Sequence, residues 1–190
     1  MIIAATVTEN EGRALSVAVE QLRRLLAQVS QRDWNIECDL LAIASNPEIR
    51  IISLLPEVES DEPIDRVKQR LREHLNASIG AGGSVFLCTI FRACNGDASK
   101  LERIRRLNLV APALSHELDA GVIDLDRMLS DIGAQQLQTD FRLDGPAARE
   151  VTAYTIVKTL LAGGFDDRIP DETVERARSM ADRAYGKATQ

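Results

Sequence analysis

The chain contains no apolar run close to the roughly 18 residues that a helix needs to cross a bilayer. Residues 1–7 are apolar, but they lack the basic start and the length of a signal peptide. These two absences predict a soluble, cytoplasmic protein that has no membrane partner.

Cysteine is scarce: only Cys38, Cys88 and Cys94 occur. Three is an odd number, and no pair has the CxxC spacing of zinc or redox sites, so neither a disulfide framework nor a structural metal is indicated. Unpaired cysteine is among the residue types most often buried, which predicts three buried free thiols. We expect no cofactor.

A surplus of basic residues is also missing, because 23 Lys and Arg face 29 Asp and Glu and give a formal net charge of −6. The basic residues are scattered, which argues against a phosphate-backbone partner and therefore against nucleic acid. The remaining candidates are a protein partner or a small anionic ligand, and self-association stays open.

What the chain does have is an ordinary globular composition, with 45% apolar and 27% charged residues over 190 positions. That length suits one well-buried core better than two. We predict a single α/β domain over residues 1–165. Residues 166–190 carry only a weak apolar stripe and predict a peripheral helix, which lies on its own domain or contacts a partner.

Strand and helix patterns alternate along the chain. Short apolar runs rich in β-branched residues predict strands at 2–7, 49–55, 84–91 and 121–125. Apolar residues three and four positions apart predict helices at 14–31, 64–79, 97–118, 126–132 and 147–161, the last one amphipathic. Pro112 should kink or split its helix. Residues 36–44 fit either a strand or a helix.

Such alternation favours a parallel sheet covered on both faces, with right-handed crossovers. The predicted fold is a three-layer α/β/α sandwich with a mainly parallel sheet of about five strands. Residues 84–91 form the most continuous apolar run, which is typical of a strand buried on both faces, so we expect this strand inside the sheet.

Ligands of open α/β sheets bind outside the carboxyl ends of the strands, so polar residues at those ends are the candidates. They are Thr8, Glu9, Asn10, Glu57, Glu59, Asp61, Arg92, Asn95, Asp126, Asp140, Arg142 and Asp144. An arginine among carboxylates can bind an anion through bidentate hydrogen bonds or form a structural ion pair with Asp140 or Glu57. Arg92, Asn95 and Arg142 are the predicted ligand-binding residues. The acidic spacings also leave Mg²⁺ open as an alternative.

The order of elements over residues 49–163, with the strand at 121–125 and the segment 139–145 before a long helix, resembles the closing part of the SGNH (GDSL-type) hydrolases. In that family an Asp-x-x-His turn supplies the acid and the base of a serine esterase. The resemblance gives Asp140 the position of the acid and Leu143 the position of the base.

The other catalytic positions implied by this resemblance also differ. The nucleophile turn reads Thr6-Val7-Thr8 instead of Gly-Asp-Ser, and the loop expected to carry oxyanion-hole donors begins at Pro56. The two histidines, His74 and His116, lie within predicted helices, away from the strand ends. A serine or threonine hydroxyl needs a base within hydrogen-bond reach, so standard serine-esterase activity is not expected.

Three hypotheses remain. The first is an SGNH-like domain that has lost catalysis and works as a binding or interaction module. The second is an acyl-ester hydrolase or acyltransferase with a rebuilt site that uses Thr8, Glu9, Arg92 and Asp140. The third is an unrelated flavodoxin-like domain with a structural or regulatory role. A cleft that gathers Thr8, Arg92, Asn95 and Asp140 would favour a site, whereas one filled by Phe141 and Leu143 would favour the module.

Overall fold

The computed structural model describes residues 1–41, 46–165 and 168–188, with side chains through 184. Its strands are β1 (Ile2–Thr6), β2 (Glu37–Asp39), β3 (Ile49–Ser53), β4 (Ser84–Cys88) and β5 (Gly121–Ile123). Its helices are α1 (Glu9–Ser30), the 3₁₀ helix η1 (Leu55–Val58), α2 (Ile64–Gly80), α3 (Ala98–Leu118), α4 (Leu125–Ile132), α5 (Ala134–Leu137), α6 (Pro146–Gly163) and α7 (Asp171–Ala188).

The five strands form one parallel sheet in the order β2-β1-β3-β4-β5. β4 lies between β3 and β5, and its Phe86 and Cys88 are buried. This confirms the predicted interior strand. The parallel direction brings the carboxyl ends of all five strands to the same edge of the sheet, where a site is expected.

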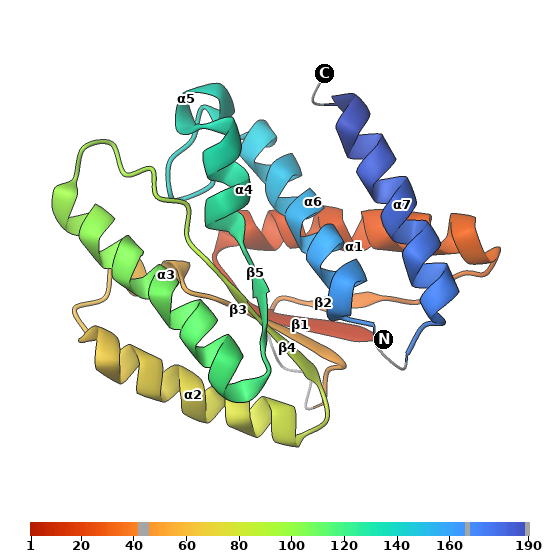
Figure 1. The fold of residues 1–190 in the computed structure, drawn as a ribbon, viewed down its shortest axis with the longest axis horizontal. Coiled ribbons are helices and arrows are strands. Elements are labelled where there is room, and N and C mark those ends of the chain that lie inside the picture. Colours follow the sequence, from red (N-terminus) through yellow and green to blue (C-terminus); the bar gives the residue numbers. More distant parts are fainter. Residues whose placement is uncertain (42–45, 166–167, 189–190) are drawn as a thin grey trace.

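Helices cover both faces of the sheet, which confirms the three-layer sandwich (Figure 1). Alternate residues of a strand point to opposite faces, and β4 follows this rule. Phe86 belongs to the core under α1, α6 and α7. Its neighbours Val85 and Leu87 belong to the second core, under α2 and α3.

The predicted amphipathic character of α6 is wrong. Ten of its 18 residues are buried, and they point in all directions around the helix axis. The reason is that α6 contacts α1, α4 and α7 as well as β5, and it lies between α4 and α7 in Figure 1, so most of its circumference is covered. The C-terminal helix α7 lies on α1 and α6 and buries Ala177 and Ala181 against them.

Other differences from the sequence prediction are local. Residues 37–39 form a short strand, whereas 42–45 lie outside the described residues. Pro112 does not split its helix, because α3 runs unbroken over 21 residues and Pro112 lies within it. Pro56 does not end β3 directly, because β3 ends at Ser53 and Pro56 is the second residue of η1. Of the three free thiols, only Cys88 is buried; Cys38 and Cys94 are partly exposed because they lie on an edge strand and in a loop.

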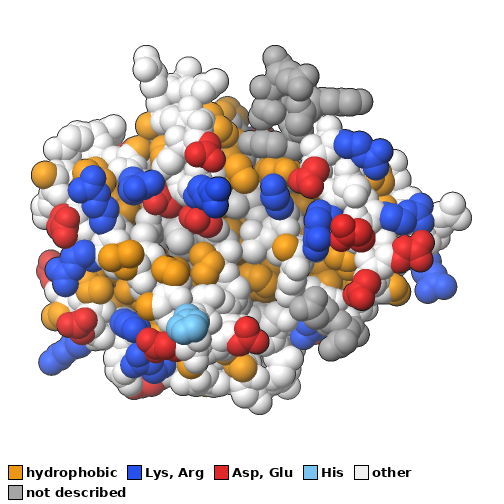
Figure 2. All heavy atoms as spheres, in the orientation of Figure 1, with side chains coloured by type: hydrophobic (Ala, Val, Ile, Leu, Met, Phe, Trp, Pro, Cys, Tyr) orange, Lys and Arg blue, Asp and Glu red, His pale blue; other side chains and the backbone are white. Residues whose placement is uncertain are grey.

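Two features are absent from the described residues. None of the helices there combines the length and apolar character needed to cross a membrane. Over the same residues, no group of three or more His, Cys, Asp or Glu side chains is arranged to hold a metal ion. On the face shown in Figure 2, basic and acidic side chains are interspersed.

Candidate functional site

A cleft opens at the carboxyl ends of β1 and β3, and we call it the strand-end cleft. It measures about 330 Å³ and lies between the start of α1, the turn η1 and the loop before α6. Its lining residues are Thr8, Glu9, Asn10, Leu55, Pro56, Glu59, Phe141 and Arg142. Asn10 donates a hydrogen bond of 2.9 Å from Nδ2 to the Arg142 carbonyl oxygen, which joins two walls of the cleft.

Beneath this cleft lies a buried carboxylate, Glu11, which is only 3% exposed. Its Oε2 accepts hydrogen bonds from the backbone N–H and the hydroxyl of Thr8, at 2.9 and 2.8 Å. Its Oε1 accepts the Ser53 hydroxyl at 2.6 Å. Thr8 and Glu11 have the spacing of a helix-capping box, so the sequence fixes this contact locally. The bond to Ser53 ties the end of β1 to the end of β3.

Burial raises the pKa of Glu11 above its ordinary value, because the charged carboxylate loses water. The hydrogen bonds from Ser53 and Thr8 act in the opposite direction and offset only part of this rise. Nearby, burial raises the pKa of the Cys88 thiol well above its ordinary value, and the charge of Glu11 adds to the shift. Negative charge is therefore costly on these two buried side chains, neither of which lines the cleft itself.

Asp140, the residue that resembles the family's acid, has its carboxylate occupied by Arg142. The Arg142 Nη1 contacts Oδ2 at 2.9 Å, and the Arg142 backbone N–H donates to Oδ1 at 2.8 Å. This is the ion pair expected between Asp140 and a strand-end arginine. Asp140 is 8% exposed, whereas the Arg142 side chain is 60% exposed and lies 4.8 Å from the centre of the Phe141 ring. The guanidinium is thus held at the mouth of the cleft.

Leu143, at the position that the family gives to the base, points into the protein interior. Its side chain is 3% exposed and belongs to the core formed with α1 and α6. Its backbone φ of 58° lies in the left-handed region, which is unusual for a bulky residue. Phe141 is 4% exposed, packs into the opposite core and also lines the strand-end cleft. The two side chains therefore anchor this loop to both cores.

The structure does not gather the remaining candidates in one cavity. Asn95 and Asp140 line a second, polar cleft of about 450 Å³, which Thr8 does not line. Asn95 approaches Asp140 at 3.5 Å. Arg92 pairs instead with Asp126, at 3.0 Å, where α4 begins. Of the predicted residues, five line the strand-end cleft, namely Thr8, Glu9, Asn10, Glu59 and Arg142, whereas Arg92, Asn95 and Asp140 do not.

Glu11 and Ser53 are not among the residues predicted from the sequence. The Thr8-x-x-Glu11 spacing signals a capping box, so the Thr8 contact was readable from the sequence. The Ser53 contact spans 42 residues and follows only from the pairing of β1 with β3.

Comparison with known proteins supports the architecture. No protein-family profile and no curated protein sequence matches this chain. Among solved structures, a lipase/acylhydrolase from Enterococcus faecalis is similar at 16% identity, with a TM-score of 0.65 over 84% of this chain and 94% of that one. A structure described as a GDSL-like lipase from Parabacteroides merdae ATCC 43184 has 13% identity and a TM-score of 0.60, covering 83% and 93% of the two chains.

A third structure, titled TesA, has 15% identity and a TM-score of 0.57 over 84% of this chain and 97% of its own. The class of protein is thus an α/β sandwich with a five-stranded parallel sheet. More particularly, the chain has the SGNH-like fold of the GDSL-type lipases and acylhydrolases. At identities this low the likeness concerns the fold alone.

Proposed function

We propose that this protein is an SGNH-like domain that has lost standard serine-esterase chemistry and binds a ligand or partner at the strand-end cleft. The observation that carries the proposal is the burial of Leu143, because the side chain at the base position is part of the core and has no proton-accepting atom. The Thr8 hydroxyl donates its hydrogen bond to Glu11 instead.

The residue at the position of the oxyanion-hole donors supports the same proposal. Pro56 lines the cleft where the resembling family carries donors to the transition-state oxygen, and proline has no backbone N–H. Loss of even one such donor costs an esterase about 10²–10³ in rate. Nucleophile, base and oxyanion donor are therefore all altered together.

A small anion is the ligand that this cleft suits best. Arg142 directs an exposed guanidinium over the Phe141 ring, and its contact with Asp140 uses only one of its amino groups, Nη1. The remaining guanidinium N–H groups of this exposed, cleft-lining side chain can donate to a carboxylate or phosphate. Glu9 and Glu59, also in the lining, are paired with Arg13 and Lys100.

The test is a thermal-shift panel of acetate, butyrate, phosphate and sulfate beside a p-nitrophenyl ester assay. We expect at least one anion to raise the melting temperature, no ester turnover above background and no labelling by a fluorophosphonate. Arg142→Ala should remove the anion effect, whereas Arg92→Ala, which deletes an arginine paired elsewhere, should keep it. Ester turnover by the wild type would overturn the proposal.

One observation favours a second candidate, an acyl-ester hydrolase or acyltransferase with a rebuilt site. The Thr8 hydroxyl lines the cleft and is hydrogen-bonded to a carboxylate whose pKa is raised. In this reaction Glu11 takes the Thr8 proton as the hydroxyl oxygen attacks the acyl carbon. The ester C–O bond then breaks, Glu11 returns the proton to the leaving alcohol, and water or another acceptor removes the acyl group from Thr8.

The two candidates differ in a covalent intermediate. After incubation with p-nitrophenyl acetate, the rebuilt enzyme would carry an acetyl group on Thr8, visible by mass spectrometry and absent from Thr8→Val. The binding module would carry none.

A further inference from the structure

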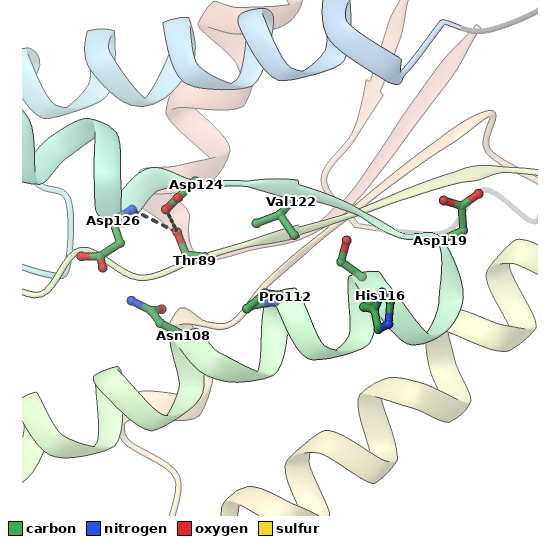
Figure 3. A pocket seen from close by; sticks show the side chains of 9 residues that line it. Thr89, Asn108, Pro112, His116, Asp119, Val122, Asp124 and Asp126 are labelled. Carbon is green, nitrogen blue, oxygen red and sulfur yellow. Dashed lines mark hydrogen bonds between the residues drawn. The ribbon is translucent and has the colours of Figure 1, made fainter.

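A large cleft runs along the free edge of the sheet, and one end of it lies at the carboxyl ends of β4 and β5. It measures about 730 Å³ and runs between β5 and α3 (Figure 3). We call it the β5-edge cleft. Its lining residues are Thr89, Asn108, Pro112, Ser115, His116, Asp119, Val122, Asp124 and Asp126.

β5 is an edge strand, so one of its sides has no neighbouring strand. The Ile123 carbonyl accepts a 3.1 Å hydrogen bond from the N–H of Thr89, the residue that follows β4. Successive residues of a strand direct their N–H and C=O groups to opposite sides, so the peptide groups of Val122 point away from β4. They form a donor–acceptor pair at the free edge, of the kind that an added strand uses.

The α3 wall adds a further acceptor. Pro112 lies inside α3 and has no N–H, so the Asn108 carbonyl lacks the helical donor that it would otherwise receive from position 112. The Asn108 side chain is already engaged, because it makes two 2.7 Å hydrogen bonds with the backbone of Ile90. Val122 and Asn108, which line opposite walls of the cleft, thus each carry a backbone acceptor without its usual donor.

The negative charge of the cleft lining favours a positively charged ligand. Among the described residues that line it, three are aspartates and none is lysine or arginine. Asp124 accepts only neutral donors, the Thr89 hydroxyl and the Arg127 N–H. Asp119 is exposed and makes no ion pair with the described residues, whereas Asp126 is paired with Arg92. Asp119 and Asp124 therefore carry negative charges that no basic side chain of the described residues neutralises.

Their placement matches an extended chain. Figure 3 shows Asp119 at one end of the cleft and Asp124 with Thr89 at the other, with Val122 between them. Side chains on one face of a strand repeat every second residue, about 7 Å apart. Basic side chains at alternate positions of a strand lying beside Val122 would consequently reach both carboxylates.

We infer that the β5-edge cleft binds an extended basic peptide segment of a partner protein, which adds as a strand to β5. Pairing with a second copy of this chain through the same edge is disfavoured, because it would bring Asp119 and Asp124 of one copy against those of the other. This inference is independent of the function proposed for the strand-end cleft.

The probe is an acetylated and amidated peptide, Lys-Thr-Lys-Thr-Lys-Thr-Lys, titrated into the full chain with ¹⁵N amide shifts and calorimetry as readouts. We expect the largest shifts at Val122 and its neighbours in β5. Two further peptides carry N-methyl groups on the lysines or on the threonines. One of them should lose binding, because one set of N–H groups must face β5.

Asp119→Asn should weaken binding by about two- to fivefold, as expected for a partly screened ion pair. Asp131→Asn, which removes the same charge from the exposed end of α4, should leave binding unchanged. The acidic peptide Glu-Thr-Glu-Thr-Glu-Thr-Glu should not bind.

Three results would overturn the inference. Shifts that avoid β5 would place the peptide elsewhere. Full binding by both N-methylated peptides, or equally tight binding of spermine, would show that charge alone is recognised. Concentration-dependent shifts of Val122 without peptide would identify a second copy as the occupant.

Discussion

The hydroxyl of Thr8 donates a 2.8 Å hydrogen bond to the carboxylate of Glu11, which is 3% exposed. Ser53, at the end of β3, binds the other oxygen of the same carboxylate. One buried acid therefore closes the capping box of α1 and joins two strand ends under the strand-end cleft. Ionisation of Glu11 in the folded protein should therefore lower the free energy of unfolding by a measurable amount.

Glu11→Gln should remove a pH-dependent loss of stability. Because the pKa of Glu11 is raised in the fold, the folded state holds its proton at pH values where the unfolded chain has released it. This contribution to stability is greatest below the ordinary pKa of about 4.5 and falls as pH rises through the raised folded value. Relative to wild type, Glu11→Gln should become more stable between pH 4.5 and 8 in urea unfolding.

The control for that series is Glu9→Gln, which changes an exposed acid of the same helical turn. Glu9→Gln removes the same charge from this turn and leaves the buried carboxylate in place, so it measures the pH dependence that does not come from Glu11. If wild type and Glu11→Gln differed by the same free energy of unfolding at every pH, Glu11 would ionise as readily in the folded protein as in the unfolded chain.

Leu143→His should destabilise the protein without creating an esterase. The imidazole would enter an apolar core, and burial of an unpaired polar group costs about 1–3 kcal/mol. Ester turnover should stay at background, because Thr8 remains bonded to Glu11 and Pro56 supplies no N–H. Leu143→Met, which roughly conserves volume, should cost less than about 1.5 kcal/mol. Turnover by the histidine variant, measured with p-nitrophenyl acetate, would show that only the base was missing.

Arg142→Ala should cost little stability, about 0.5–1.5 kcal/mol, because the guanidinium is 60% exposed and solvent screens its ion pair. What loss there is comes from Asp140, which is 10% exposed at its side chain and would lose a charged donor. Urea unfolding measures the change, and Arg142→Lys should recover part of it. A cost above about 3 kcal/mol would assign Arg142 a mainly structural role.

Gly121→Ala should be destabilising by about 1–3 kcal/mol through overpacking. A Cβ at Gly121 would lie 2.3 Å from the ring of Phe86, which is buried against the sheet. Gly80→Ala is the matched control: nothing lies within 4 Å of its added Cβ, and alanine is the better helix former. We expect unchanged or slightly raised stability for the control, by thermal unfolding. Equal effects at both sites would contradict the close approach.

The local elements could be predicted because their signals are local. Apolar spacing set α1, α2 and α3 to within a few residues, and the unbroken apolar run of β4 placed it inside the sheet. The sequence wrongly predicted an amphipathic α6. The side of α6 that was expected to face solvent is covered by α7, and this tertiary contact leaves no local pattern in the sequence of α6. α5 was missed because four residues carry too little pattern.

For the candidate site, too, some properties follow from the sequence and others only from the tertiary structure. The sequence by itself determined that the positions of nucleophile and base carry Thr8 and Leu143, because residue identity fixes what a side chain can donate or accept. Only the tertiary structure decided that Arg142 binds Asp140 while Arg92 binds Asp126, since the sequence predicted Asp140 or Glu57 as the partner of either arginine and Asp126 lies 34 residues from Arg92. The burial of Glu11 under Ser53 was likewise decided by strand pairing, which brings residues 42 positions apart into contact.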